Sequence, residues 1–255
     1  MIELATFSIV NNYFHNLLQW TFTAESEVPN GTMIDVYRSE SSGISDSLQD
    51  YVCIASGQSA DVDFQDSTIT RINDRVWYYK LKIQSGALLT ADPAYVKSAP
   101  SDYVIKEVLR RKTLALTRFT ARPFVLLKKR TWGTHCTRCW DATLFRCTDP
   151  NCSVCYGTGW VDGYFTPIVF KGMVNASPKY NQILMFGEWK PSDSMLFTLN
   201  YPLLSPRDVV VDDEGKRWVV IQIRYLKKLG YIIEQQVQLA QVANEDKVYS
   251  IPIND

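Results

Sequence analysis

Four cysteines in the middle of the chain constrain its fold more than any other feature of the sequence. They form two Cys-x-x-Cys pairs separated by twelve residues: Cys136, Cys139, Cys152 and Cys155. Two such turns facing each other present four thiolates, the soft ligands that a tetrahedral Zn²⁺ prefers. Gly157 and Gly159 follow the second pair and let the backbone turn tightly beneath the sulfurs. We therefore predict a structural zinc ribbon over residues 123–163.

Two further residues near these pairs could reach the metal. Cys147 lies between the pairs and His135 precedes the first one, and either could replace one of the four cysteines. We expect Cys147 to be a free thiol, because the paired spacing already completes the tetrahedron. Four protein ligands leave no position for water, so we expect the zinc to fold the segment rather than to catalyse a reaction.

The placement of the cysteines argues against the other uses of such residues. Five of the six fall between positions 136 and 155, whereas a disulfide scaffold spreads its cysteines along a small secreted domain. A redox pair would need a βαβ pattern, which the sequence lacks. An acid precedes the apolar residues of the first segment, so we expect no secretory signal and a reducing compartment. Cys53 lies alone in a predicted strand, where we expect a small buried side chain.

The composition favours a folded protein that is not an enzyme. Hydrophobic residues make up 46% of the 255 residues and charged residues 21%, which suffices for a sizeable core. The two histidines, His15 and His135, leave few options for acid–base catalysis. The acid-rich stretch 208–214 is better explained as a hairpin tip than as a catalytic carboxylate site. No apolar run is long enough to span a membrane, so we expect no membrane partner.

Charge is unevenly distributed although the net charge is zero. Residues 1–100 carry 12 acids and 6 bases, whereas residues 108–140 carry nine bases and no acid. Such blocks indicate either solvated faces or a surface that meets nucleic acid or an acidic neighbour. The bases next to the cysteine pairs, interleaved with Trp132 and Trp140, are candidates for facing DNA or a partner: Lys128, Lys129, Arg130 and Arg138.

Period-two alternation predicts a mainly β fold with β-rich regions on both sides of one helix. In residues 1–99 the strands 17–22, 33–38, 51–55 and 76–83 are separated by the turns Asn30-Gly31, Ser42-Gly43, Ser56-Gly57 and Asn73-Asp74. Such spacing is typical of an antiparallel sandwich. Apolar residues then recur at helical spacing over 101–120, which predicts a linking helix within 100–122. The pair Arg122-Pro123 ends it, and a strand follows at 124–127.

Residues 164–255 have the pattern of a small β-barrel or sandwich. The expected strands are 165–170, 183–186, 195–199, 208–212, 216–224, 231–242 and 248–251. The short loop Asp213-Glu214-Gly215 predicts a hairpin, because glycine tolerates the positive φ that such a turn needs. Five or more meandering strands in so few residues favour a barrel.

The first 99 residues resemble a fibronectin type III-like module. The likeness rests on Trp20, on the stretches 34–43 and 64–66, and on the Trp-Tyr-Tyr-Lys-Leu-Lys-Ile run at 77–83. It implies an immunoglobulin-like sandwich whose core is packed by Trp20 and by Tyr78 or Tyr79. The family serves mainly as a spacer or adhesive module, so the resemblance implies no chemistry.

The second half of the chain is similar to structural proteins of tailed bacteriophages. Residues 127–168 resemble segments in which two Cys-x-x-Cys pairs and a Gly-Thr-Gly precede a strand, and 205–223 resemble the hairpin of small head-closure or connector barrels. The resemblance implies a neck ring, usually a hexamer, between the portal or adaptor of the head and the tail-terminator or tail-tube proteins. Its lumen would pass the genomic DNA, and it would be assembled in the host cytoplasm. A zinc-ribbon nucleic-acid-binding protein and a tail or baseplate component are the alternatives.

Overall fold

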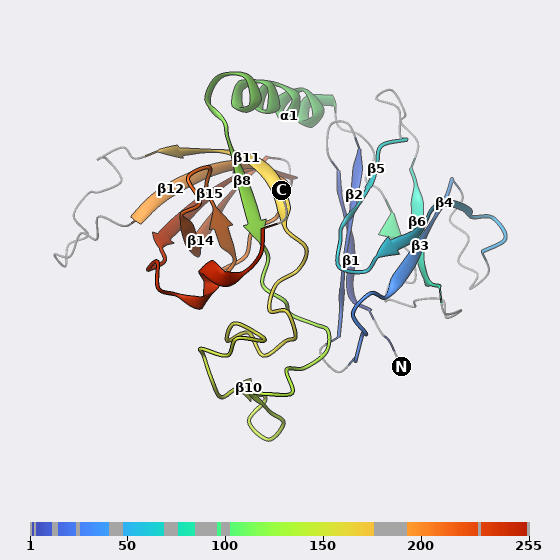
Figure 1. Cartoon of the computed structure of the whole chain (residues 1–255). Helices are drawn as coiled ribbons and strands as arrows, with labels where there is room; N and C mark the ends of the chain where they lie inside the picture. The colour runs from blue at the N-terminus through green and yellow to red at the C-terminus, as the bar shows by residue number, and fades with distance from the viewer. Residues whose placement is uncertain are drawn as a thin grey trace. The chain divides into compact units, whose positions relative to one another are not determined.

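The computed structural model describes residues 2, 4–11, 15–23, 26–40, 48–68, 76–84, 96–97, 103–175, 193–228 and 231–253, and it is mainly β (Figure 1). The chain forms two compact units. One combines Met1–Lys106 with Arg130–Gly163, and the other combines Glu107–Lys129 with Tyr164–Asp255. Each unit is therefore built from two separate stretches of sequence.

In the N-terminal part of the first unit, seven strands form two antiparallel sheets. The three-stranded sheet has the order β1-β2-β5 and the four-stranded sheet the order β4-β3-β6-β7. The strands are β1 (Leu4–Asn11), β2 (Asn16–Phe22), β3 (Met33–Ser39), β4 (Val52–Ser59), β5 (Phe64–Asp66), β6 (Tyr78–Ile83) and β7 (Val96–Lys97). The predicted strands 17–22, 33–38 and 76–83 thus correspond to β2, β3 and β6.

The core between these two sheets combines apolar burial with a satisfied polar network. Trp20 and Tyr79 are buried, as predicted, whereas Tyr78 is half-buried. The Tyr79 hydroxyl donates to Asp66 Oδ2 (2.9 Å) and accepts from Asn16 Nδ2 (3.1 Å). Arg38 Nη1 donates to the same carboxylate oxygen at 2.7 Å. Because β2, β5 and β6 supply these groups, the network links the two sheets and compensates the burial of Asp66.

Two predictions for the strand at 51–55 are wrong. Ser56-Gly57 is not a turn, because β4 continues to Ser59 through a β-bulge opposite Asp35. The Asp35 carboxylate accepts hydrogen bonds from Ser56 Oγ (2.7 Å) and Gly57 N (2.9 Å), and Gly57 adopts φ +69°. Cys53 is exposed rather than buried, because β4 is an edge strand.

The turn at Asn30-Gly31 is confirmed. The predicted turns Ser42-Gly43 and Asn73-Asp74, and the predicted strand 183–186, lie outside the described residues.

The linking helix is confirmed over its described part. Helix α1 spans Tyr103–Ala115 and continues as a π-helical turn, η1 (Leu116–Thr120). Lys112 Nζ donates to Glu234 Oε2 at 2.6 Å and its side chain stays 46% exposed. Among the described residues, no helix is both long and apolar enough to cross a membrane.

Six strands of the second unit close into a barrel with the order β11-β12-β15-β14-β13-β8 (Figure 1). Their bounds are β8 (Arg122–Leu127), β11 (Ile168–Asn175), β12 (Asp193–Leu199), β13 (Val209–Val211), β14 (Arg217–Lys228) and β15 (Tyr231–Gln241). Its core is apolar: Phe124, Leu126, Phe170, Leu196, Leu204, Val210, Val220, Val237 and Leu239. The sequence-based boundaries placed β8 with the cysteine segment, whereas β8 pairs with β11 and β13 of the barrel.

The hairpin at 208–224 is confirmed, with one carboxylate organising its loop. Asp212 Oδ1 accepts from Glu214 N (3.0 Å) and Lys216 N (2.8 Å), and Gly215 adopts φ +79°. The predicted strand at 248–251 is wrong, because Lys247–Ser250 is a 3₁₀ turn, η2. Asp246 caps that turn by accepting from Val248 N, which competes locally with strand pairing.

Candidate metal centre

The cysteine segment is an insertion between β8 and β11, and its two ends are hydrogen-bonded to each other. Lys129 and Tyr164 form an antiparallel bridge, and Phe165 N donates to Lys128 O at 2.9 Å. Further into the segment, Arg130 N donates to Gly163 O at 3.0 Å and Cys136 N donates to Gly159 O at 2.8 Å. This ladder holds the base of the segment closed and brings the two Cys-x-x-Cys turns together.

The four predicted ligands meet in one buried cluster. Their Sγ atoms all lie within 4.8 Å of one another, and the four residues are Cys136, Cys139, Cys152 and Cys155. The Sγ atoms of Cys136 and Cys152 are 3.8 Å apart and those of Cys139 and Cys155 are 3.1 Å apart. A tetrahedral ion with metal–sulfur bonds of about 2.3 Å separates its sulfurs by roughly 3.8 Å. None of these pairs is at the disulfide distance of about 2.05 Å, and all six cysteines are free. The Cys136–Cys152 distance matches this separation and the Cys139–Cys155 distance is shorter, so the four sulfurs are close enough together to bind one metal ion.

Each Cys-x-x-Cys turn is closed by its own backbone hydrogen bonds. Trp140 N donates to Cys136 O (3.1 Å) in the first turn, and Tyr156 N donates to Cys152 O (2.9 Å) in the second. Gly157 adopts φ +75°, and a Cβ there would lie 2.6 Å from Pro150 O. Glycine is thus required at position 157 by both the dihedral angle and the close approach of the backbone.

The protein already favours a thiolate at one of the four positions. Burial raises the pKa of the Cys152 thiol, but hydrogen bonds from the N–H groups of Val154 and Cys155 and with the thiols of Cys155 and Cys136 together lower that pKa to about 7. Burial and the neighbouring sulfurs raise the pKa of Cys139. Four thiolates gathered out of water repel one another, so a divalent cation supplies the charge that this donor set lacks.

Cys147 lies against the cluster, within reach of the metal site as its position between the two pairs suggests. It belongs to a two-residue strand, β10 (Arg146–Cys147), which pairs with β9 (Trp140–Asp141). Its Sγ is 2.7 Å from Cys139 Sγ and 3.8 Å from Cys155 Sγ. The structure therefore brings five sulfurs together rather than four.

His135 is placed by aromatic stacking. Its ring lies 3.9 Å from the Trp140 ring and 4.1 Å from the Trp160 ring, with interplanar angles of 15° and 23°. Burial lowers its pKa, which favours the neutral imidazole. Among the described residues, the group of possible metal ligands at this site consists of the four cysteines and includes neither His135 nor Cys147.

The four predicted DNA- or partner-facing bases have different environments. Arg130 is buried and forms a two-point ion pair with Asp61, at 2.6 and 3.1 Å. Lys128 and Lys129 are half-buried, and burial lowers the pKa of Lys129. Arg138 is exposed and donates to Ser153 Oγ at 3.2 Å.

The two tryptophans interleaved with these bases also differ. Trp132 is buried with its ring edge-on to Phe22, at 4.7 Å between centroids. Trp140 is half-buried against His135. Of the predicted basic and aromatic set, Arg138 is thus the residue whose side chain is fully at the surface.

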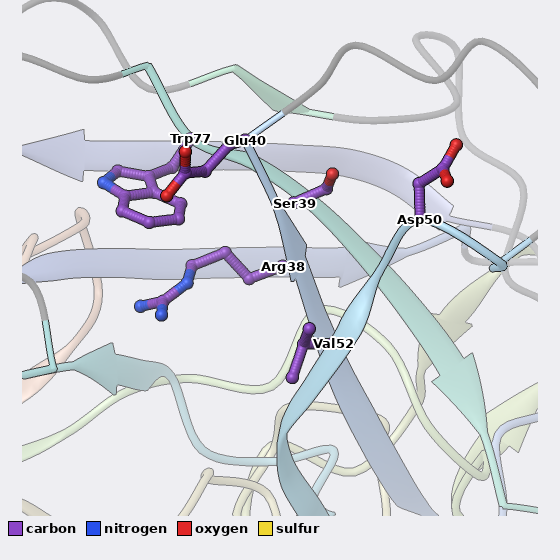
Figure 2. Close-up of a pocket in the computed structure, with 6 residues that line it drawn as sticks. All are labelled: Arg38, Ser39, Glu40, Asp50, Val52 and Trp77. Carbon is purple, nitrogen blue, oxygen red and sulfur yellow. The ribbon is translucent and has the colours of Figure 1, made fainter.

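A surface hollow of about 520 Å³ in the first unit has no counterpart in the sequence-based predictions (Figure 2). It is lined by Arg38, Ser39, Glu40, Asp50, Val52 and Trp77. The Arg38 guanidinium lies over the Trp77 ring at 4.2 Å, a cation–π contact. These residues come from separate strands and loops and share no motif, so no pattern in the sequence marks them.

Comparisons with known proteins do not identify a family for this chain. No family model matches the sequence, and no curated protein matches it. One solved structure with partial likeness is the pectate lyase Pel3 from Pectobacterium carotovorum, which is 21% identical over 38% of this chain and 27% of its own length. Its TM-score is 0.28, so the likeness carries no argument about fold or activity.

Proposed function

We propose that this chain is a structural virion protein of a tailed phage, in which the cysteine cluster holds one Zn²⁺. The observation that carries the proposal is the buried cluster of Cys136, Cys139, Cys152 and Cys155, inserted between two strands of a closed barrel. Four protein thiolates would fill the coordination shell and leave no position for a substrate or water. The role of the metal is then to order residues 130–163, and the protein is not an enzyme.

The strand order of the first unit supports a fibronectin type III-like module. A three-stranded sheet β1-β2-β5 and a four-stranded sheet β4-β3-β6-β7 follow the arrangement of a seven-strand sandwich. Trp20 and Tyr79 fill the core positions that the sequence resemblance implies. Such a module acts as a spacer or adhesive surface in the virion.

Within the virion we propose a place in the neck. The similarity of residues 127–168 to structural proteins of tailed phages and of residues 205–223 to connector proteins supports it, together with the barrel that both segments enter. Copies would form a ring, a hexamer in this proposal, between the portal or adaptor and the tail-terminator or tail-tube proteins, with genomic DNA in the lumen. The acidic first 100 residues and the basic stretch 108–140 offer complementary charges for head-to-tail contacts in such a ring.

The burial of Arg130 and Trp132 favours this assignment over a zinc-ribbon protein that binds nucleic acid. Neither side chain can meet a phosphate or a base while it is packed inside the first unit. A dedicated nucleic-acid surface needs accessible cations and stacking platforms. Salt-sensitive retention of the purified chain on DNA at low ionic strength would reverse this preference.

Two measurements test the proposal. Elemental analysis of the purified chain should find about one zinc per polypeptide. Mass spectrometry and cryo-electron microscopy of virions should find the chain as a ring at the head–tail junction. Absence from virions, or a position at the baseplate, contradicts the neck assignment but leaves the zinc result standing.

A further inference from the structure

The sulfurs of Cys139 and Cys147 lie at the same coordination position of the proposed metal site. Cys139 Sγ and Cys147 Sγ are 2.7 Å apart, whereas two thiolates bound to one Zn²⁺ are separated by roughly 3.8 Å. These two sulfurs are too close to be ligands of the same ion in this arrangement, and Cys139 Sγ is also nearer to Cys155 Sγ (3.1 Å) than that separation. Cys147 Sγ is, however, 3.8 Å from Cys155 Sγ, which matches the separation expected for two ligands.

The backbone keeps Cys147 in register with Cys139. Cys147 pairs with Trp140 in the β9–β10 hairpin, and Thr148 N donates to Cys139 O at 2.8 Å. Cys139 is 3% exposed, and Cys147 is half-buried. Backbone hydrogen bonds of the β9–β10 hairpin thus hold the Cys147 sulfur at the more accessible side of the cluster.

We propose that Cys147 is an exchange ligand that takes the place of Cys139. This proposal rests on the zinc site proposed above: three ligands stay constant, and the fourth position is taken by either Cys139 or Cys147. The constant ligands are Cys136, Cys152 and Cys155.

The exchange is balanced in protons and charge. Cys147 Sγ lies within hydrogen-bond distance of Cys139 Sγ (2.7 Å) and of Asp149 O (3.0 Å), and in the exchange its thiol proton would end on the departing Cys139 sulfur. One sulfur–metal bond forms as the other breaks, and the number of thiolates on the metal stays at four. The consequence is a site that keeps its metal after Cys139 is lost or chemically modified.

Cysteine-to-serine variants of the full chain separate this proposal from a site with four fixed ligands. We expect Cys139→Ser to keep about one zinc per chain and, after loading with Co²⁺, to keep the absorption spectrum of four-thiolate coordination. The double variant Cys139→Ser/Cys147→Ser should show three-thiolate coordination or lose the metal. Cys136→Ser is the matched control, because Cys147 Sγ lies beside Cys139 Sγ. We expect the Cys136→Ser variant not to keep four-thiolate coordination.

Alkylation with iodoacetamide, mapped by mass spectrometry, gives an independent readout. In zinc-loaded Cys139→Ser, Cys147 should be protected, whereas in zinc-loaded Cys147→Ser it is Cys139 that should be protected. Exposed Cys53 should react equally in both variants and serves as the internal reference.

The outcomes are distinguishable from a failure of the zinc site itself. Wild-type chain without zinc contradicts the proposed site. A wild type that holds zinc, beside a Cys139→Ser variant that loses metal or order as Cys136→Ser does, overturns the exchange alone.

Discussion

The barrel and the cysteine segment reach ordered structures by opposite means. The barrel packs nine buried apolar residues inside a closed ring of six strands. In residues 130–163 the two strands are two residues long each, and the cluster at the centre of the segment consists of cysteine side chains. Apolar burial stabilises the first region, whereas the second has too little apolar surface of its own and depends on its sulfurs and on anchors at its base.

This contrast indicates which changes should destabilise each region. Strand pairing and core packing are distributed over many residues, so the barrel tolerates changes outside its core. The cysteine segment concentrates its stabilisation in a few contacts, so the loss of a ligand that has no substitute should affect the whole segment. The predictions below test this division, from the largest expected effect to the smallest.

Removing the metal should produce the largest difference in stability between the cysteine segment and the barrel. Structural zinc contributes about 10–16 kcal/mol of apparent binding free energy in zinc-finger peptides. We therefore expect a chelator, or Cys152→Ser, to abolish hydrogen-exchange protection in 130–163 while β14 and β15 keep theirs. Cys53→Ser is the control, because Cys53 is exposed on β4. Unchanged protection of 130–163 after chelation would contradict a structural metal.

Breaking the ion pair at the base of the segment should have the next largest effect. Asp61→Ala removes the carboxylate that forms an ion pair with the buried guanidinium of Arg130, and breaking a buried ion pair costs about 3–5 kcal/mol. The double variant Asp61→Leu/Arg130→Met removes both charges and should recover part of that loss. Urea unfolding measures both variants. Equal destabilisation by the single and double variants would show that the charge pair is not the cause.

A cavity in the barrel should destabilise that region without affecting the metal. Leu196 is fully buried, and Leu196→Ala should lower the free energy of unfolding by about 2–5 kcal/mol. Val169→Ala on neighbouring β11 is the control, because Val169 is 71% exposed. Zinc content should stay at the wild-type value in both. Loss of zinc in Leu196→Ala would mean that the two regions are not independent.

The smallest effect concerns pH and the barrel. Burial raises the pKa of Asp208 to about 6, although its carboxylate accepts hydrogen bonds from Lys129 N (2.9 Å) and Ser205 N (2.7 Å). The unfolded chain has a value of about 3.9, so the native state binds this proton more readily. The free energy of unfolding should therefore decrease by up to about 3 kcal/mol as pH rises from about 4 to about 6, and stay level above.

Asp208→Asn should remove this slope, as measured by hydrogen exchange of the barrel strands in urea across that pH range. An identical slope in the variant would assign the pH dependence to another group.

The sequence was most informative where local chemistry decides the structure. The spacing of the cysteine pairs identified the four residues that cluster, and the Asp-Glu-Gly loop identified the β13–β14 hairpin. Alternation also located β2, β3 and β6. In each case the determining residues are neighbours in the chain, so a short window contains the information.

The remaining features depend on partners that are distant in sequence. Whether Cys53 is buried depends on the position of β4 at a sheet edge, and the bulge at Ser56-Gly57 depends on Asp35 across the sheet. Arg130 is buried because Asp61, 69 residues away, receives it. A prediction based on local pattern buries Cys53, makes Ser56-Gly57 a turn and leaves Arg130 at the surface. The structure differs in each case, because tertiary pairing overrides local preference.

Because hydrogen bonds join the two ends of the cysteine segment, the barrel could accept a different insert between β8 and β11. Lys129 and Tyr164 are antiparallel bridge partners, so the outgoing and returning chain are about 4.5–5.5 Å apart at that point. Any insert whose own termini lie equally close could be grafted there with little added closure entropy. Replacing residues 130–163 with a reporter domain should thus leave the strand pairing of the barrel and the Lys129–Tyr164 bridge intact.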